Sequence, residues 1–297
     1  MPDVAAGSTL NRVRVRLLGC VDVTVDGVPR PVEGVRRKTI LAVLALRAGQ
    51  IVSADRLIDE VWGEQAPAKA LNALQRHVSY LRTVLDVPRA IVSRPPGYIL
   101  QLAGEPTDVQ VAERLIRDAG QVADPARQAV WLREALGLWR DESLADVRGH
   151  GRLEEQAQRL DQLRHSAVRA LTGARLELGE HAWLVPELQH LAQRYPYDEE
   201  VHRQLMLALH RTGRPADALE AYQRLRCILD EDLGVDPSPP LRDLQAAILR
   251  HDPALDPSLD TALGPATRPK SRPPSRLRVH RFRGCAGWGR CRRRAAR

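Results

Sequence analysis

The chain opens with residues that alternate between apolar and polar types, which is the period of a half-buried β-strand. In RVRVRL (12–17) every second residue is apolar, and VDVTVDGVP (21–29) repeats this period around Asp26-Gly27, a strong signal for a tight hairpin turn. The pattern predicts a small antiparallel sheet at the start of the chain.

Apolar residues then recur at helical spacing in three successive stretches. RRKTILAVLALRAG (36–49) is apolar nearly all round, which is typical of a buried helix, and SADRLIDEVWG (53–63) predicts a second helix with Ser53 as its N-cap. A third helix is predicted over 68–86, followed by two short strands around a turn in AIVSRPPGYILQL (90–102). A sheet, three helices and a hairpin follow one another in a winged helix-turn-helix, with the third helix as recognition helix and the hairpin as wing.

The polar residues of the third helix form a face without a carboxylate. Its apolar residues recur at spacings of three and four and form one stripe: Leu71, Leu74, Val78, Leu81 and Leu85. Opposite this stripe, with Gln75 and His77 at the edges, lie Lys69, Asn72, Arg76, Ser79, Tyr80 and Thr83. A solvated surface usually mixes Glu with Lys or Arg, whereas this face offers donors and amides that bond phosphate oxygens and base edges. On this stretch alone, a solvated surface and a nucleic-acid reader are both open.

Residues 108–250 are predicted to be helical throughout. LTGARLELGEHAWLVPELQHLAQRY (171–195) aligns with LMLALHRTGRPADALEAYQRLRCIL (205–229) at a shift of 34 residues, with Gly179 matching Gly213. This period, with glycine between paired helices, indicates a tetratricopeptide-like stack. The aromatic residues of this region are interpreted as core, because aromatics at helical spacing are more often core than ligand contacts: Trp131, Trp139, Trp183, Tyr195 and Tyr222.

The net charge of +8 is unevenly distributed along the chain. Residues 1–104 hold 14 Lys and Arg against 9 Asp and Glu, residues 105–261 hold 19 against 28, and residues 262–297 hold 12 against none. The face without a carboxylate therefore lies in a basic segment, which favours the nucleic-acid interpretation.

The motifs of common enzyme classes are missing from the sequence. GVRRKT (34–39) has Arg37 where a nucleotide-binding loop needs glycine, His202 and His210 lack zinc-protease spacing, and no Gly-x-Ser-x-Gly motif occurs. The four cysteines have neither disulfide nor zinc spacing, and no secretory signal or membrane-spanning run is found. We expect a cytoplasmic, nucleoid-associated protein that is not an enzyme and has no cofactor, metal site or membrane partner.

Several blocks in order resemble a known family. RLLG, DVTVDG, DRLIDEVWG, NALQRHVSYLR and RPPGYIL are similar to the OmpR-type DNA-binding domain of the SARP (AfsR-like) activators, which are named for antibiotic regulation in actinomycetes. EALGLWR, YPYDEEVHRQLMLALHRTGRPADALEAYQRLR and DEDLGVDPSPPLRDL resemble the bacterial transcriptional activation domain that follows it. The resemblance implies an activator of a secondary-metabolite gene cluster that binds direct repeats of promoter DNA, self-associates there and recruits RNA polymerase. The Pro95-Pro96 pair in the wing departs from the family pattern.

These observations give one prediction for fold and one for function. The fold is mostly α, with a winged helix containing small β elements (12–104) and an all-α tetratricopeptide-like domain (105–251) before a Pro- and Arg-rich linker and tail (252–297). The function is sequence-specific activation of transcription, and the alternative is a helical-repeat scaffold whose front domain binds protein.

Candidate contact residues fall into three groups. The predicted DNA contacts are the polar residues of the third helix together with Arg94 of the wing, and the predicted phosphate contacts are Arg36, Arg37 and Lys38. The loop GEQAPAK (63–69) is expected to be exposed, and its Glu64 and Gln65 are the candidate polymerase contacts, with a plain solvated turn as the alternative. The basic tail is expected to be disordered, with nonspecific nucleic-acid binding as the alternative.

Overall fold

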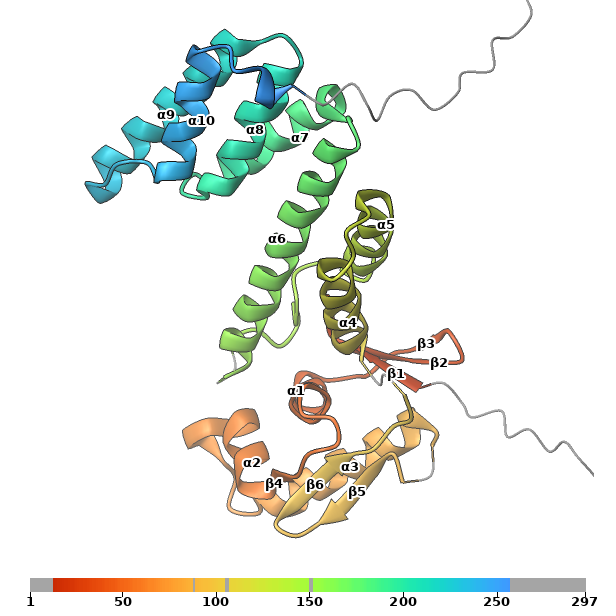
Figure 1. The fold of residues 1–297 in the computed structure, drawn as a ribbon. Coiled ribbons are helices and arrows are strands. Elements are labelled where there is room, and N and C mark those ends of the chain that lie inside the picture. The colour runs from red at the N-terminus through yellow and green to blue at the C-terminus, as the bar shows by residue number, and fades with distance from the viewer. Residues whose placement is uncertain (1–12, 88, 105–106, 150–151, 257–297) are drawn as a thin grey trace, which may run out of the picture. The chain divides into compact units, whose positions relative to one another are not determined.

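The computed structural model describes residues 13–87, 89–104, 107–149 and 152–256. Within these ranges the chain is mostly helical, with two small antiparallel sheets in its N-terminal third and only helices after residue 107 (Figure 1). This confirms the predicted fold class. The predictions about the basic tail lie outside the described residues.

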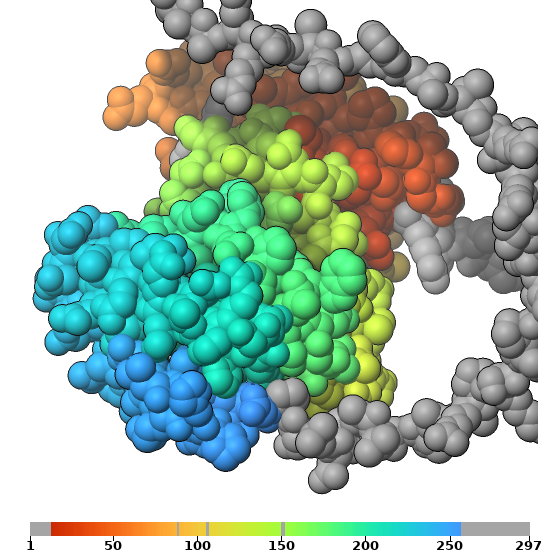
Figure 2. All heavy atoms as spheres, turned by 90° about the horizontal axis from the view of Figure 1, so that it is seen from above, coloured from red at the N-terminus to blue at the C-terminus, as the bar shows by residue number. Residues whose placement is uncertain are grey.

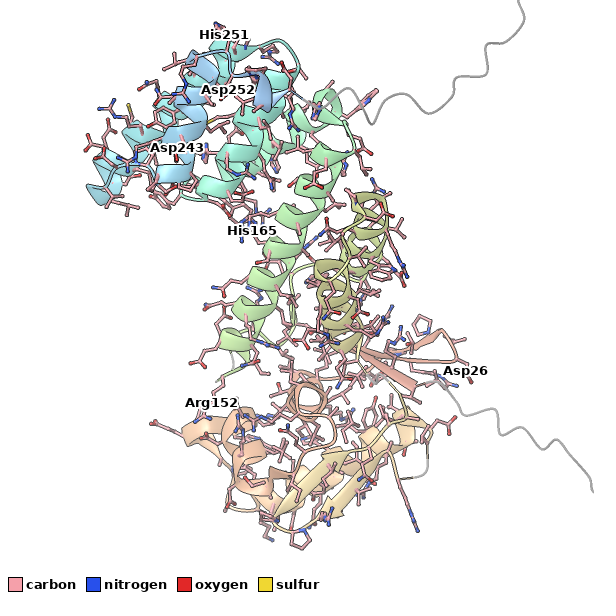
Figure 3. All side chains as sticks on the ribbon, viewed as in Figure 1. Asp26, Arg152, His165, Asp243, His251 and Asp252 are labelled. Carbon is pink, nitrogen blue, oxygen red and sulfur yellow. The ribbon has the colours of Figure 1, made fainter. Side chains whose placement is uncertain are left out.

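The first sheet forms as the alternating pattern predicts. Strands β1 (Val13–Arg16), β2 (Asp22–Val25) and β3 (Val28–Arg30) pair antiparallel in the order β1-β2-β3. Val25 pairs with Val28, so Asp26 and Gly27 alone make the turn, with φ of 51° and 80°. Both residues have the positive φ of a type I′ hairpin turn, and Asp26 lies at the outer end of this sheet (Figure 3).

The winged helix follows, and its elements are bounded as follows: α1 (Val35–Leu46), β4 (Val52–Ser53), α2 (Ala54–Trp62), the 3-10 turn η1 (Gly63–Gln65), α3 (Ala70–Leu85), β5 (Ile91–Arg94) and β6 (Gly97–Leu100). Seven consecutive residues of α1 are buried, from Thr39 to Ala45, as its apolar sequence predicts. The Ser53 side chain accepts a hydrogen bond from Arg56 N and caps α2. Helix α1 ends three residues before Gly49, whose N–H instead donates to Leu100 O of β6 at 2.9 Å.

Helix α3 packs on α1 and α2 through a narrower stripe than the sequence suggests. Leu74, Val78, Leu81 and Leu85 are buried, whereas Leu71 is 49% exposed. The prediction was wrong for Leu71, because the first turn of α3 begins before the helix meets the core formed with α1 and α2.

Seven helices form the rest of the described chain: α4 (Asp108–Gly120), α5 (Pro125–Leu136), α6 (Leu153–Glu177), α7 (His181–Arg194), α8 (Glu199–Arg211), α9 (Pro215–Leu233) and α10 (Pro239–Leu249), followed by the 3-10 turn η2 (Pro253–Leu255). Gly179 and Gly213 turn the chain between α6 and α7 and between α8 and α9, with φ of 83° and 75°. Ala174 and Ala208, which the same shift of 34 residues aligns, are both buried. Helices α7 to α10 and the C-terminal end of α6 share one buried apolar cluster, which agrees with the predicted repeat. In the space-filling view these residues, coloured green to blue, form a continuous mass (Figure 2).

The helical prediction was wrong between Gly137 and Arg152, which form no helix in the described residues. The backbone there hydrogen-bonds in part to the turn between β1 and β2: Arg140 N donates to Leu18 O and Leu144 N to Leu17 O, both at 2.9 Å. Because these long-range bonds satisfy the backbone, the segment takes an irregular path with Leu144 fully buried.

The winged helix and the helical region share one apolar core. Val109, Trp139, Leu144 and Leu160 belong to the same buried cluster as the core residues of β1, α1 and α3. The two parts of the chain are thus packed against each other, and the boundary at residue 104 stays a prediction.

Three carboxylates, of which Asp108 and Glu60 are buried, also connect the two parts of the chain. Asp108, at the start of α4, accepts hydrogen bonds from Leu17 N at 2.8 Å and Leu18 N at 3.1 Å. Asp146 accepts from Val21 N at 2.9 Å, and Glu60 of α2 accepts from Arg152 N, just before α6, at 3.0 Å. Each carboxylate thus ties a backbone amide of one part to the other part.

The aromatic residues of the helical region do not all lie in the core. Trp139 and Tyr222 are buried, as predicted, and Trp131 and Tyr195 are half-buried. Trp183 on α7 is 81% exposed, so the core interpretation was wrong for it. A helical period places a side chain on a face, but it does not show whether a neighbouring helix covers that face.

The described residues lack two features that would point to other kinds of protein. None of their helices combines the length and apolar character needed to cross a bilayer. No cluster of three or more His, Cys, Asp or Glu side chains within them has the arrangement of a metal site.

Asp108 gives a pH-dependent prediction. Burial raises the pKa of its carboxyl group to about 6, although the Leu17 and Leu18 amides and Arg140 oppose the rise. Since the folded-state pKa lies above the usual value of 3.8, the group's contribution to stability is present below pH 4 and is lost as the pH rises through 6, by up to about 3 kcal/mol. Asp108→Asn should remove this decline. Urea unfolding of both proteins at pH 4.5 and 7 tests this, and equal pH dependence would contradict it.

Candidate nucleic-acid interface

The exposed face of α3 carries six of the eight polar residues predicted to contact DNA on this helix. Lys69, Asn72, Gln75, Arg76, Ser79 and Thr83 are exposed. Among the described residues, neither Lys69 nor Arg76 pairs with a carboxylate, and only Thr83 bonds within the face, donating to Ser79 O at 3.3 Å. The face is therefore cationic, rich in donors, and free to bind a ligand.

His77 and Tyr80 lie at the edge of this face and are half-buried. The His77 ring stacks on Trp62 of α2, with 6.0 Å between ring centroids, and the Tyr80 hydroxyl accepts a long hydrogen bond from Glu33 N at 3.5 Å. Burial lowers the pKa of His77, and the nearby Arg37, Arg36 and Arg76 lower it further. Both side chains therefore fix α3 against its neighbours.

Arg36 and Arg37, at the start of α1, lie next to α3. The guanidinium carbon of Arg37 is 3.8 Å from the centroid of the Tyr80 ring, and that of Arg36 is 5.9 Å from the Trp62 ring. Arg37 also donates to Glu33 O at 3.4 Å. Aromatic faces orient these guanidinium groups without neutralising them. In the described chain neither arginine pairs with a carboxylate, so two predicted phosphate contacts adjoin the recognition helix.

Lys38 does not join this pair. Its ammonium group forms an ion pair with Asp146, the same carboxylate that accepts from Val21 N. Lys38 is thereby directed towards the helical region, although it follows Arg37 in sequence. Lys38 therefore does not belong to the candidate interface, because this half-buried ion pair would have to break before Lys38 could contact a phosphate.

The wing carries Arg94, which is exposed at the end of β5, opposite Gly97 of β6. The wing is closely packed against β4 at Gly97: a Cβ atom at this position would lie 1.8 Å from Val52 O of β4. Only glycine allows β6 to approach β4 this closely, so Gly97 fixes where the wing leaves the sheet.

Arg82 is a positioning residue that the sequence analysis missed. From α3 its Nε donates to Ile91 O at 2.8 Å, and its Nη2 donates to Ser93 Oγ at 2.9 Å, so it connects the recognition helix to strand β5 of the wing. Its partners lie nine and eleven residues along the chain, and no helical spacing links them. The sequence therefore contains no signal for this role, because the two hydrogen bonds are seen only when α3 and β5 are packed together.

Glu64 and Gln65 lie in η1, between α2 and α3, and both are exposed. Among the described residues Glu64 forms no ion pair. The loop is thus accessible beside the recognition helix, as expected for a contact with another protein and equally for a solvated turn.

Comparison with known proteins gives two family matches. Residues 34–100 match the family described as "Transcriptional regulatory protein, C terminal", and residues 107–249 match "Bacterial transcriptional activator domain".

Individual relatives span both matched regions. The chain is 37% identical to the regulatory protein DnrI of Streptomyces peucetius, covering 73% of this chain and 85% of DnrI. It is 39% identical to the regulatory protein AfsR of Streptomyces coelicolor, covering 82% of this chain but 25% of AfsR. The structure of Mycobacterium tuberculosis EmbR in complex with a low-affinity phosphopeptide has a TM-score of 0.77 and 30% identity, covering 81% of this chain and 66% of EmbR.

Arg82 generates a prediction that concerns the wing alone. Arg82→Lys keeps the positive charge but cannot donate to Ile91 O and Ser93 Oγ in the same fork geometry. We expect faster amide hydrogen exchange in residues 91–94 and little change in α1. Ser93→Ala, which removes one of the two bonds, should give a smaller effect in the same segment. Unchanged exchange in both variants would show that Arg82 does not hold the wing.

Proposed function

The chain belongs to the SARP family of transcriptional regulators, and from this premise we propose that it is an activator that reads promoter DNA with helix α3. The observation that carries the proposal is the exposed face of α3, which has no carboxylate from Lys69 to Leu85 and adjoins Arg36 and Arg37. Phosphates attract unpaired cations, and base edges require donors and amides, so this surface matches both components of duplex DNA.

We assign base reading to Asn72 and Arg76, which are exposed one helical turn apart. Asn pairs with adenine edges and Arg with guanine edges in the major groove. Lys69, Gln75, Ser79 and Thr83 then contact phosphates or neighbouring bases, with Arg36 and Arg37 on the adjacent backbone and Arg94 of the wing in the next groove. His77 and Tyr80 contribute by holding α3 and Arg37 in place.

The wider arrangement on DNA follows from the family. We propose that copies bind direct repeats of promoter DNA in a secondary-metabolite gene cluster and contact one another there. The relatives DnrI and AfsR are named as regulatory proteins. Bound in this way, the protein is nucleoid-associated.

A protein-binding scaffold is the alternative function. It would use the helical region and leave the cationic face of α3 without a role. Selection of DNA sequences from a random pool with the full chain separates the two, because a scaffold enriches no sequence.

The central prediction concerns Asn72 and Arg76. Replacing both with alanine should weaken binding to the selected DNA site by at least about tenfold, since each base contact contributes about 1–3 kcal/mol. Both side chains are exposed, so the fold should survive. Arg30→Ala is the matched control, since it removes an exposed charge of the same domain from β3. Fluorescence anisotropy measures the affinities, and wild-type affinity in the double variant would refute the assignment.

A second prediction concerns polymerase contact. We propose that Glu64 and Gln65 of η1 meet a basic surface of RNA polymerase when α3 lies in the major groove. Replacing both with alanine should lower transcription in vitro while promoter affinity stays the same, because neither residue lies on the α3 face. If transcription is undiminished, the contact lies elsewhere, and the helical region becomes the candidate.

A further inference from the structure

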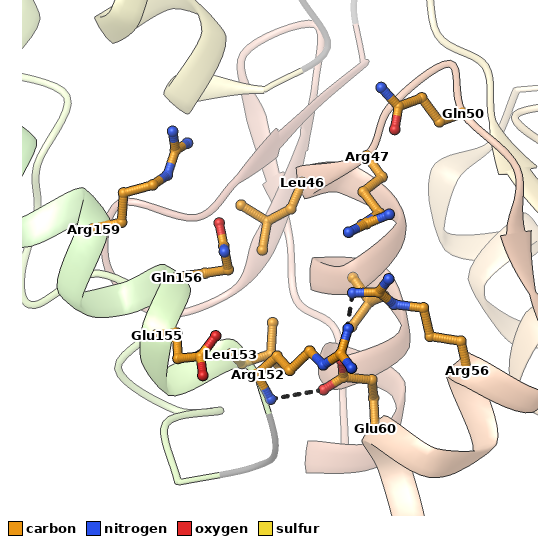
Figure 4. A pocket seen from close by; sticks show the side chains of 11 residues that line it. Leu46, Arg47, Gln50, Arg56, Glu60, Arg152, Leu153, Glu155, Gln156 and Arg159 are labelled. Carbon is orange, nitrogen blue, oxygen red and sulfur yellow. Dashed lines mark hydrogen bonds and ion pairs between the residues drawn. The ribbon is translucent and has the colours of Figure 1, made fainter.

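A cavity of about 500 Å³ lies where α1 and α2 of the winged helix meet the start of α6 (Figure 4). Leu46 and Arg47 line it at the end of α1, and Arg56 and Glu60 line it from α2. Arg152, just before α6, and four residues of α6 also line it: Leu153, Glu155, Gln156 and Arg159. Its walls therefore come from both parts of the chain. None of these residues belongs to the candidate DNA interface.

Three guanidinium groups gather along one side of this cavity. Figure 4 shows the side chains of Arg47, Arg56 and Arg152 reaching this side from three different elements. Glu60 is the carboxylate nearest to them. It is buried, accepts a hydrogen bond from Arg152 N at 3.0 Å, and lies 3.9 Å from the Arg56 guanidinium. Glu60, which already accepts a hydrogen bond from Arg152 N, is thus the carboxylate beside these three arginines.

The donors on this side are incompletely satisfied. The Nε atom of Arg56 is buried and has no hydrogen-bond partner among the described residues. Within the same residues Arg47 pairs with no carboxylate, whereas Arg159, at the far end of the cavity, pairs with Glu113 at 2.9 Å. A buried donor without an acceptor destabilises the fold unless something else supplies the acceptor. Gln50 and Gln156 add amide groups to the lining.

We propose that this cavity binds a small molecule through a phosphate group. Arg47, Arg56 and Arg152 outnumber the two lining carboxylates, Glu60 and Glu155, so the cavity keeps a surplus of positive charge that attracts a phosphate anion. Planar guanidinium groups bond phosphate oxygens in pairs. Glu155 lines the cavity on the α6 side, across from the arginines, and repels anions there. The phosphate therefore lies on the arginine side, and the rest of the ligand lies towards Leu46, Leu153 and Gln156.

Binding at this position has a mechanical consequence. Arg47 and Arg56 belong to the winged helix, and Arg152 directly precedes α6. A phosphate held by all three connects the two parts of the chain as the Glu60 contact does. The ligand therefore stabilises the contact between the winged helix and the helical region, which we call the junction. Stabilisation by the ligand does not depend on whether α3 reads DNA.

Thermal unfolding of the full chain with sodium pyrophosphate tests the site. At constant ionic strength, pyrophosphate should raise the Tm of the wild-type protein, because it binds the folded state. Isothermal titration should show binding weakened about tenfold or more in Arg47→Gln and in Arg152→Gln, since each variant loses charge-assisted hydrogen bonds. Glu155→Gln should bind severalfold more tightly, because it removes a repelling charge. Arg30→Gln, with its charge change far from the cavity, should behave as wild type.

Three results would overturn the proposal. One is a Tm rise of equal size in the two arginine variants, which would place the anion elsewhere. Another is weaker or unchanged binding in Glu155→Gln. The third is the absence of any pyrophosphate effect together with a shallower salt dependence of DNA binding in Arg47→Gln, which would assign these arginines to DNA phosphates. Arg47→Gln carries the test if Arg152→Gln fails to fold, since Arg47 is exposed.

Discussion

The turn between β1 and β2 presents backbone amides that its own sheet cannot satisfy, and the helical region supplies their acceptors. Asp108 accepts from Leu17 and Leu18, and Asp146 accepts from Val21. An unpaired buried amide costs about as much as the hydrogen bond it lacks, so the turn and these carboxylates require each other. The irregular segment after α5 follows from the same constraint, because it pairs with this turn instead of continuing a helix.

The Asp146 carboxylate that binds this turn also determines how the basic residues at the start of α1 are arranged. Asp146 draws Lys38 to the junction, whereas Arg36 and Arg37 lie over the rings of Trp62 and Tyr80. An aromatic ring orients a guanidinium group without cancelling its charge, so the positive potential beside α3 is preserved. Three consecutive basic residues therefore serve two purposes: one stabilises the junction and two extend the candidate DNA surface.

Local pattern was sufficient for the fold wherever one short segment determines its own structure. The two-residue period and the Asp26-Gly27 turn predicted the first hairpin, the Ser53 cap predicted the start of α2, and the 34-residue repeat predicted the paired helices around Gly179 and Gly213. The polar face of α3 was equally predictable, because residues on one helix face have fixed spacing. Six of the eight polar residues that the period selects are exposed, whereas His77 and Tyr80 are half-buried and Leu71 of the apolar stripe is exposed.

The sequence by itself thus determined the elements, the class of fold and the chemical character of the recognition face, since these depend on neighbours within a few residues. Only the tertiary structure decided which contacts form between residues that are far apart in the sequence. It joined Lys38 to Asp146, 108 residues away, tied Arg82 to the wing, and left Trp183 exposed where helical spacing favoured burial. It also brought Arg47, Arg56 and Arg152 around one cavity. Such contacts depend on how separate elements pack, and no periodicity along the chain records that packing.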